Sequence, residues 1–238
     1  MRIRGERECK DCGTRWSYYE TGTPDCPNCG SLHSVGVGDR AQHTAGTATL
    51  DLSPARNLLD GGDGDVRAAA ERAAEDCRTF ARQHGFIDAG ELAPLDETYV
   101  GALELRTVAD ELARTMRTSD AEEAYFLALL GGVDDGERPA PAEVPESLRA
   151  ARGLAAAKAV KEYRSDVSSY LDDQPDEAAR AAFGTLGEHR KRIEALDGDV
   201  PPATADRLVR VARELGAYLR EGDESALVTA RDRLSRLG

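Results

Sequence analysis

The stretch that decides the fold of the N-terminal part reads CKDCGTRWSYYETGTPDCPNCGS and covers residues 9–31. It contains two Cys-x-x-Cys-Gly units on either side of a short aromatic segment. The four cysteines, Cys9, Cys12, Cys26 and Cys29, follow the spacing C-x2-C-x13-C-x2-C. Each unit can curl so that both of its sulfurs face one ion, and four thiolates in a tetrahedral set suit Zn²⁺. We therefore expect these four residues to bind one structural zinc ion.

The residues around the cysteines predict the turns and strands of a small β-structure. Gly13 and Gly30 each follow the second cysteine of a unit, where a tight turn needs positive φ, and Pro27 stiffens the second turn. The segment 14–20 has the aromatic and β-branched composition of a strand, and the segment 32–37 can return as a second or third strand. Two hairpins with an ion between their knuckles form a zinc ribbon.

Residues 7–38 resemble the zinc ribbon at the N-terminus of transcription factor B and of its eukaryotic counterpart, transcription factor IIB. The resemblance rests on RECKDCGTRW followed by CPNCGS and covers about a seventh of the chain. It implies a zinc-binding ribbon that docks on the transcription or translation machinery or on nucleic acid. Ribosomal proteins, polymerase subunits and many enzymes carry similar ribbons. Rubredoxins share the Cys-Pro-x-Cys-Gly knuckle but separate their knuckles further, so iron is the alternative metal.

The chain departs from the pattern of transcription factor B after the ribbon. A reader segment and two basic cyclin-like repeats should follow there, whereas this chain continues with a Gly-rich joint and an acidic helical block. The resemblance therefore covers the ribbon alone.

Four cysteines close the coordination shell of the metal, which argues against catalysis. Catalytic zinc sites have three protein ligands and an open position for water. His33, four residues after Cys29, is interpreted as a surface strand residue. No Ser/His/Asp set, inward carboxylate pair or second metal cluster stands out in the sequence, so we expect no enzyme.

The composition is acidic and poor in lysine. The formal net charge is −13, and only 4 of the 31 Lys and Arg residues are lysine. This resembles proteins of salt-accumulating halophilic archaea, in which surface carboxylates keep the protein soluble. The Debye length is only about 3 Å at about 1 M salt. The acidity is therefore an adaptation to solvent in this interpretation, and it does not exclude a nucleic-acid partner.

The ribbon is neutral, with six cationic and six anionic side chains in residues 1–40, so the net negative charge lies downstream. The candidate contacts to nucleic acid or to a protein partner are the basic and aromatic residues of this segment, Arg2, Arg4, Arg7, Arg15 and Trp16. The Trp16 ring can stack on bases or pack the small core of the ribbon, and the sequence leaves both interpretations open.

The chain divides into a zinc ribbon at 1–40, a connector at 41–64 and an acidic helical domain at 65–238. The connector is rich in small residues. A short strand is expected at 48–52, and an Asp/Gly-rich flexible joint is expected at 60–65.

Apolar residues recur at every third or fourth position after residue 65, which is typical of amphipathic helices. About six or seven helices are expected, packed as a bundle or as stacked hairpins. Ser119 and Glu122 predict a capping box, and Pro145 and Pro175 are expected to open helices. Cys77 lies on an apolar stripe and is interpreted as a buried small side chain. The predicted fold is a small β zinc ribbon followed by an all-α helical bundle.

No apolar run approaches the roughly 20 residues that a membrane-spanning helix needs, and the start has no apolar signal region. We therefore expect a cytoplasmic protein with a protein partner, with nucleic acid as a further candidate partner, and with no membrane contact and no small-molecule substrate. The first functional hypothesis is a non-catalytic zinc-ribbon binding protein of the transcription or translation machinery. The second is a protein–protein adaptor with a purely structural zinc ion. The third is an enzyme with an unrecognised site in the helices.

Overall fold

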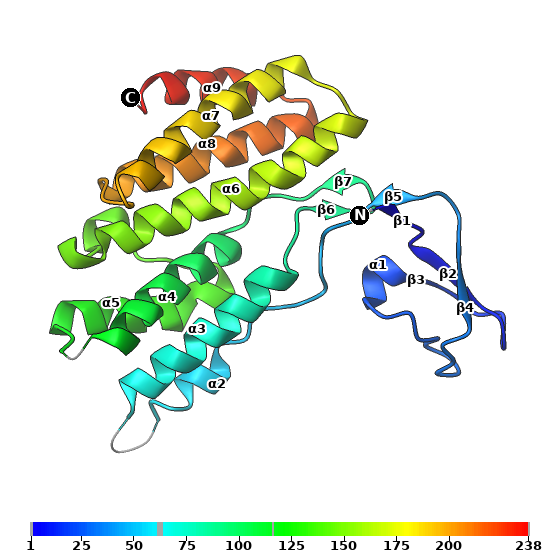
Figure 1. Cartoon of the computed structure of the whole chain (residues 1–238), viewed down its shortest axis with the longest axis horizontal. Coiled ribbons are helices and arrows are strands. Elements are labelled where there is room, and N and C mark those ends of the chain that lie inside the picture. Colours follow the sequence, from blue (N-terminus) through cyan, green and yellow to red (C-terminus); the bar gives the residue numbers. More distant parts are fainter. Residues whose placement is uncertain (1, 61–63, 116, 238) are drawn as a thin grey trace.

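The computed structural model describes residues 2–60, 64–115 and 117–237. It places a small β-region beside a layered group of helices (Figure 1). This arrangement confirms the predicted fold class, a small β-region followed by a helical part.

The β-region is built around a three-stranded antiparallel sheet in the order β3-β2-β4. The central strand is β2 (Glu6–Cys9), with β3 (Arg15–Ser17) on one side and β4 (Ser34–Val37) on the other. Strand β2 runs into the first Cys-x-x-Cys unit, and β3 leaves it. The returning strand predicted at 32–37 is confirmed in β4.

The second half of the strand predicted at 14–20 is wrong. Those residues enter the single helical turn α1 (Tyr18–Thr21). The Tyr18 N–H donates to the Gly5 carbonyl at 2.7 Å, and the Tyr19 ring fills the space that a side chain at Gly5 would occupy. Both contacts involve Gly5, which is distant in sequence from Tyr18 and Tyr19. They favour a helical turn at this point over a longer strand.

Two pairs of very short strands lie between the ribbon and the helices. Strand β1 (Arg2–Ile3) pairs with β5 (Ala41–Gln42), and β6 (Ile87–Asp88) pairs with β7 (Glu91–Leu92). The Gly90 N–H donates to the carbonyl of the last β5 residue at 2.8 Å. The ribbon thereby continues into the helical part through backbone hydrogen bonds.

The connector is attached to the helical part by a carboxylate. Asp166 accepts hydrogen bonds from the Thr44 hydroxyl and from the Phe86 N–H, both at 2.6 Å. The Thr44 N–H donates to the Ile87 carbonyl at 2.8 Å. These bonds hold the start of the connector against the helices.

The strand predicted at 48–52 is wrong. These residues form no strand, and Leu52 is completely buried in the core of the helical part. The next residues form the single helical turn α2 (Ser53–Arg56). Pro54 suits its start because proline lacks the N–H that the first turn leaves unpaired, and Asp51 accepts from the second residue after it at 2.9 Å.

The flexible joint predicted at 60–65 includes residues 61–63, which lie outside the described residues. Both Leu52 and Ala55 of the connector belong to the same hydrophobic core as the helices. The division of the chain into three parts stays a prediction.

The part of the chain described after residue 65 forms seven α-helices, which confirms the predicted six or seven. The helices and the intervening 3-10 turns are α3 (Val66–Gln83), α4 (Glu97–Arg114), α5 (Asp120–Gly132), η1 (Val133–Asp135), η2 (Pro141–Glu143), η3 (Glu146–Leu148), α6 (Arg149–Asp173), α7 (Glu177–Ala195), α8 (Pro202–Glu221) and α9 (Glu224–Ser235).

The predicted helix starts are mostly confirmed. Ser119 and Glu122 form the predicted capping box at the start of α5. Asp176, directly after Pro175, caps α7 by accepting from the Ala179 N–H at 2.8 Å. The start predicted at Pro145 is early, because a 3-10 turn precedes α6.

Helix α6 lies between two groups of helices (Figure 1). It packs on α4 of one group, where α3 and α5 also lie, and on α7 and α8 of the other group, which α9 covers. A continuous hydrophobic core runs through both groups, from Leu52 to Leu237. The ribbon has a separate small cluster made of Cys9, Trp16 and Cys26.

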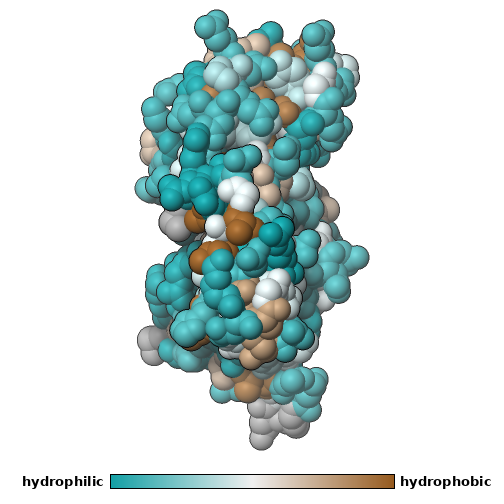
Figure 2. Space-filling model, turned by 90° about the vertical axis from the view of Figure 1, so that its right-hand side faces the viewer, coloured by the Kyte–Doolittle hydropathy of each residue, from teal (hydrophilic) through white to brown (hydrophobic). Residues whose placement is uncertain are grey.

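The surface is dominated by hydrophilic residues. Figure 2 shows the face on the ribbon side, which is mostly hydrophilic, with a few hydrophobic residues near the middle and others scattered above and below. Among the helices of the described residues, none is both long enough and apolar enough to span a membrane.

Candidate metal centre

The two Cys-x-x-Cys units fold into matching knuckles. The Cys9 N–H donates to the Thr14 carbonyl at 2.9 Å, and the Gly13 N–H donates to the Cys9 carbonyl at 3.0 Å. The second knuckle repeats both bonds at the equivalent positions, at 2.9 and 2.8 Å. Gly13 and Gly30 have φ values of 73° and 70°. The positive φ expected of both glycines is confirmed.

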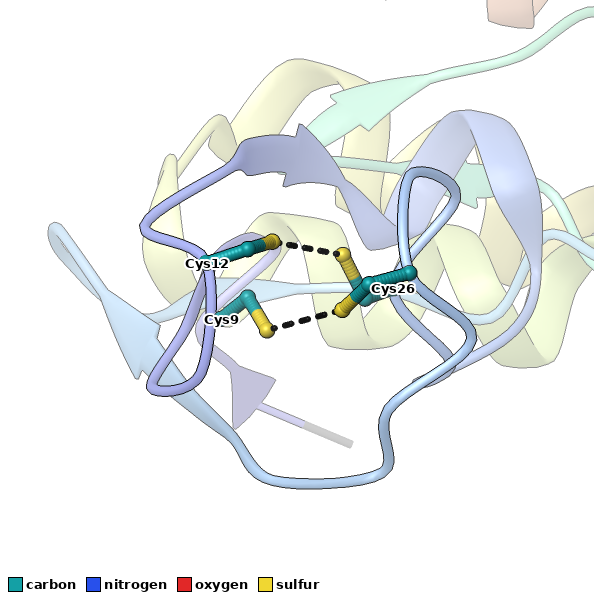
Figure 3. A group of neighbouring side chains, drawn as sticks. Cys9, Cys12 and Cys26 are labelled. Atoms are coloured by element: carbon teal, nitrogen blue, oxygen red, sulfur yellow. Dashed lines mark hydrogen bonds between the residues drawn. The ribbon is translucent and has the colours of Figure 1, made fainter.

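The knuckles bring the four predicted ligands together. All four Sγ atoms lie within 4.8 Å of one another. The Cys12–Cys26 and Cys9–Cys29 sulfurs are each 3.6 Å apart, and the first two cysteines point across to the second knuckle (Figure 3). A tetrahedral zinc ion with Zn–S bonds of about 2.3 Å needs sulfurs about 3.8 Å apart. The donor set and its spacing therefore fit one Zn²⁺.

The sulfurs differ in exposure by position within each knuckle. The first cysteine of each, Cys9 or Cys26, is buried, and the second, Cys12 or Cys29, is exposed. Hydrogen bonds with the Thr14 side chain and backbone lower the pKa of Cys12 to about 6. A backbone hydrogen bond from Ser31 lowers the pKa of Cys29, but the neighbouring cysteines and burial outweigh it and raise this pKa to about 12. The two exposed sulfurs therefore differ in how readily they form the thiolate, which is the form that binds metal. Four thiolates fill a tetrahedral shell, and the ion would link the two hairpins.

His33 is not a fifth ligand. Its side chain is 81% exposed, and its Nδ1 lies 3.7 Å from Asp11 Oδ2. The predicted surface position is confirmed, whereas the predicted strand position is wrong because β4 begins one residue later.

The structure places two of the candidate contact residues in ion pairs. Arg2 pairs with Asp173 at the end of α6, and Arg15 pairs with Glu8 of the neighbouring strand at 2.7 Å. Their charges are thus partly neutralised within the chain.

The other three candidates differ in their surroundings. Arg7 donates to the Ser34 hydroxyl at 2.9 and 3.0 Å. Trp16 is 7% exposed and belongs to the ribbon core. Arg4 is exposed, and no ion pair holds it among the described residues. The contact role proposed for these residues stays a prediction.

A buried network of charged side chains joins the two groups of helices, and the sequence pattern did not predict it. Arg152 on α6 is 2% exposed and donates to both carboxylate oxygens of Asp206 on α8, at 2.9 and 2.7 Å. It also donates to Glu104 on α4 at 3.2 Å and to the Tyr125 hydroxyl at 3.0 Å. Burial alone would lower the pKa of Arg152, but Asp206 and Glu104 outweigh burial and raise it. The guanidinium therefore stays charged.

Arg138, in the loop after η1, extends this network. It donates to the second oxygen of Glu104 at 2.7 Å and to Glu97 at 3.0 Å. Glu97 also pairs with Arg213 of α8. These ion pairs connect α4 with α6 and α8.

The sequence carries one sign of this network. Glu104 interrupts an apolar run in α4, and Arg152 falls on the apolar face of α6. A charged residue on a buried face needs a partner. The sequence does not show which residue provides the partner, because Arg152 and Asp206 are 54 positions apart.

Cys77 is buried, as predicted, and burial raises the pKa of its thiol. It lies in the core of the helical part, which the ribbon cluster does not join. The fifth cysteine is therefore a core side chain.

The model of a family of unknown function, DUF7117, matches residues 1–234. The chain belongs to this family. The match spans the ribbon and nearly all of the helical part. No curated protein and no solved structure matches the chain. The specific likeness to the ribbon of transcription factor B stays a prediction.

Proposed function

We propose that the chain is a non-catalytic binding protein whose ribbon, held by one structural zinc ion, docks on a protein partner. The observation that carries this proposal is the convergence of four cysteine sulfurs within 4.8 Å of one another. Four thiolates leave no position for a substrate at the ion. The ion then stabilises a surface for binding.

Exposed apolar residues beside the second knuckle support a protein partner. Leu32 is 69% exposed and Val35 is 38% exposed. Val35 lies on β4, an outer strand of the sheet, opposite Glu8 of β2. An outer strand with exposed apolar side chains is a surface on which proteins commonly pair.

The charges of the ribbon favour protein over nucleic acid at this surface. Arg2 and Arg15 have carboxylate partners, and the Trp16 ring is buried. Binding to a nucleic-acid backbone needs free cations. We assign the partner to the transcription or translation machinery because of the ribbon resemblance. The acidic, lysine-poor composition supports a salt-rich cytoplasm as the location.

The test is an affinity capture from the native host at its own salt concentration, with and without nuclease. We compare the wild type with the double variant Leu32→Glu/Val35→Glu and with Val228→Glu on α9, a matched control because Val228 is 67% exposed. Polymerase or ribosomal subunits that survive nuclease and are lost only with the ribbon variant support the proposal.

Two outcomes contradict the docking proposal. Partners that disappear with nuclease would show that nucleic acid mediates the capture. Partners retained equally by the ribbon variant, with one zinc ion per chain still present, would place docking elsewhere.

A second candidate function is a protein–protein adaptor that docks through its helices. A hollow of about 270 Å³ lies where α7 leads into α8, and its lining includes Ile193, Val200 and Leu237. Leu196 at its rim is 50% exposed. A partner that Leu196→Glu loses and that Leu32→Glu/Val35→Glu keeps would favour the adaptor.

A further inference from the structure

Cations are concentrated on two neighbouring helices of an otherwise acidic chain. The segments 158–164 of α6 and 188–194 of α7 together carry six Lys and Arg residues and three Glu residues. Three of the four lysines of the chain, Lys158, Lys161 and Lys191, lie in these segments. The formal net charge of the whole chain is −13, so this local excess of positive charge stands out.

The two segments lie side by side. The Arg164 side chain of α6 lies over Gly187 of α7, where a Cβ atom would be 2.6 Å from the guanidinium carbon. The Arg164 Nε–H donates to the Phe183 carbonyl at 2.8 Å. The guanidinium therefore spans the junction of the two helices, and no hydrogen bond from its two terminal nitrogens to α7 is present among the described residues, so these N–H groups can donate to a ligand.

The Arg164 charge at this junction is not neutralised by an ion pair within the described part of the chain, whereas Lys191 and Arg190 each pair with a glutamate. Arg164 has no carboxylate within ion-pair distance among the described residues. Burial and the positive charge of Arg190 lower the pKa of Arg164. Glu188 of α7 opposes this lowering of the pKa, and its carboxylate pairs with Lys191 at 2.9 Å.

Arg190 adds a second incompletely paired guanidinium. Its side chain is 10% exposed and pairs with Glu194 at 2.5 Å, while its buried Nε has no hydrogen-bond partner among the described residues. Arg190 thus has one carboxylate partner. By contrast, Arg152 in the buried network has two carboxylate partners.

We propose that the α6–α7 face, whose accessible cations are Lys161, Arg164 and Lys191 and to whose positive charge the buried Arg190 adds, binds the phosphate backbone of a nucleic acid. Lysine and arginine are the principal phosphate-binding side chains, and arginine matches phosphate geometry with its planar fork. None of these four residues lines a described cavity. An open face suits an extended phosphate backbone better than a small molecule, which usually binds in a cavity.

The test is fluorescence anisotropy with labelled duplex DNA and labelled single-stranded RNA of equal length, over a series of salt concentrations. The key variant is Lys161→Gln/Lys191→Gln, because both side chains are exposed and their loss leaves the core intact. Lys10→Gln is the matched control, since Lys10 is the one lysine outside the helices. Far-UV circular dichroism verifies that both variants are folded.

We expect the wild type to bind and the double variant to bind roughly tenfold or more weakly at ~0.1 M salt, with Lys10→Gln unchanged. The slope of log K against log salt should fall by about 1.8 for duplex DNA, because each phosphate contact contributes about 0.9. This combination supports backbone binding at the α6–α7 face.

Several results would overturn the proposal. One is the absence of wild-type binding at low salt, and another is equal binding by the double variant. A loss confined to Lys10→Gln would place nucleic acid on the ribbon. Displacement of the oligonucleotide by inorganic phosphate at constant ionic strength would show a site for small anions instead.

Discussion

The ribbon and the helical part of this chain are stabilised in different ways. The buried cluster of the ribbon consists of Cys9, Trp16 and Cys26, whereas the helices share a continuous core that runs from Leu52 to Leu237. So few buried side chains cannot offset the conformational entropy of about forty ordered residues. We therefore expect the ribbon to depend on a metal ion at its four cysteines and the helical part to depend on burial.

The two parts also differ in how they place charge. The ion pair between Arg15 and Glu8 in the ribbon lies at the surface, whereas Arg152 and Glu104 are buried between helices. Exposed pairs contribute little to stability, while breaking a buried pair is strongly destabilising. Substitutions in the two parts should therefore change stability by different amounts. Different spectroscopic signals should detect them in the ribbon and in the helices.

The largest expected effect is the loss of a zinc ligand. Cys26→Ser should abolish zinc binding and unfold the ribbon, because structural zinc contributes about 10–16 kcal/mol to the folding of such modules. Trp16 is the only tryptophan of the chain, so its fluorescence reports on the ribbon, and far-UV circular dichroism reports on the helices. We expect the Trp16 emission to shift to the red while the helical signal stays.

Cys77→Ala is the matched control for this prediction, since Cys77 lies in the core of the helices. It should keep one zinc ion per chain, measured by metal analysis. A Cys26→Ser protein that retains zinc and an unshifted emission would refute the ligand assignment.

The next effect is the disruption of the buried network. Arg152→Ala leaves the fully buried Glu104 without one of its two arginine partners, and such a loss costs about 3–5 kcal/mol. Urea denaturation followed by far-UV circular dichroism measures the change in the free energy of unfolding.

Arg67→Ala provides the comparison for the network. Arg67 forms an exposed pair with Glu71 at 3.4 Å, so its loss should change stability by less than about 0.5 kcal/mol. Equal changes in the free energy of unfolding for Arg152→Ala and Arg67→Ala would show that the network does not stabilise the packing of the helices.

A smaller effect is expected where two backbones approach closely. Gly153 of α6 lies against the Gly198 carbonyl, and a Cβ atom at Gly153 would be 2.1 Å from that oxygen. Gly153→Ala should destabilise the helical part by about 1–3 kcal/mol through overpacking. Thermal denaturation compares it with Gly184→Ala on the exposed side of α7.

A Cβ atom added at Gly184 would meet no other atom of the described residues within 4 Å beyond its own helix backbone. Gly184→Ala should stabilise α7 by about 0.5–1 kcal/mol, since alanine is favoured over glycine within helices. A Gly153→Ala variant as stable as the wild type or more stable would contradict the close approach at Gly153.

The smallest effect concerns pH. The His84 ring lies 4.6 Å from Tyr99 and 4.9 Å from Phe86, and burial lowers the pKa of His84, although Asp96 and Asp166 oppose this. A lowered pKa in the folded state means that the unfolded chain binds the proton better. Stability is therefore fully present above the unfolded pKa of about 6.5 and is lost as the pH falls through the folded pKa.

Urea denaturation at about pH 7.5 and about pH 5.5 tests this prediction, a range that brackets the unfolded pKa of histidine. The wild type should lose more stability than His84→Gln between the two values. Because the range ends about one unit below the unfolded pKa, the difference should be at most about 1.4 kcal/mol. Parallel loss in both proteins would show that another group causes the pH dependence.

Local patterns predicted the clustering of the four cysteines and most of the helices. Cys9 and Cys12 lie in one local turn, which closes with the hydrogen bond from the Gly13 N–H to the Cys9 carbonyl. The capping box of Ser119 and Glu122 is likewise complete within four residues. The cysteine cluster and the helix starts could therefore be predicted without knowledge of the fold.

Contacts between distant residues determined the features that the sequence did not predict. The α1 turn forms where Tyr19 covers Gly5. Residues 48–52 form no strand, and Leu52 is buried in the core of the helical part. The partners of Arg152 lie 48 and 54 positions away. No periodic pattern records such pairings, since each depends on how the helices pack.

The claim that zinc holds the ribbon and not the helices is tested most directly by removing the metal from the wild-type protein. A strong chelator is titrated while Trp16 fluorescence, far-UV circular dichroism and released zinc are followed together. We predict the release of one zinc ion per chain, with a red shift of the Trp16 emission and an almost unchanged helical signal. Loss of the helical signal in step with zinc release, or an unshifted emission after complete release, would contradict the claim.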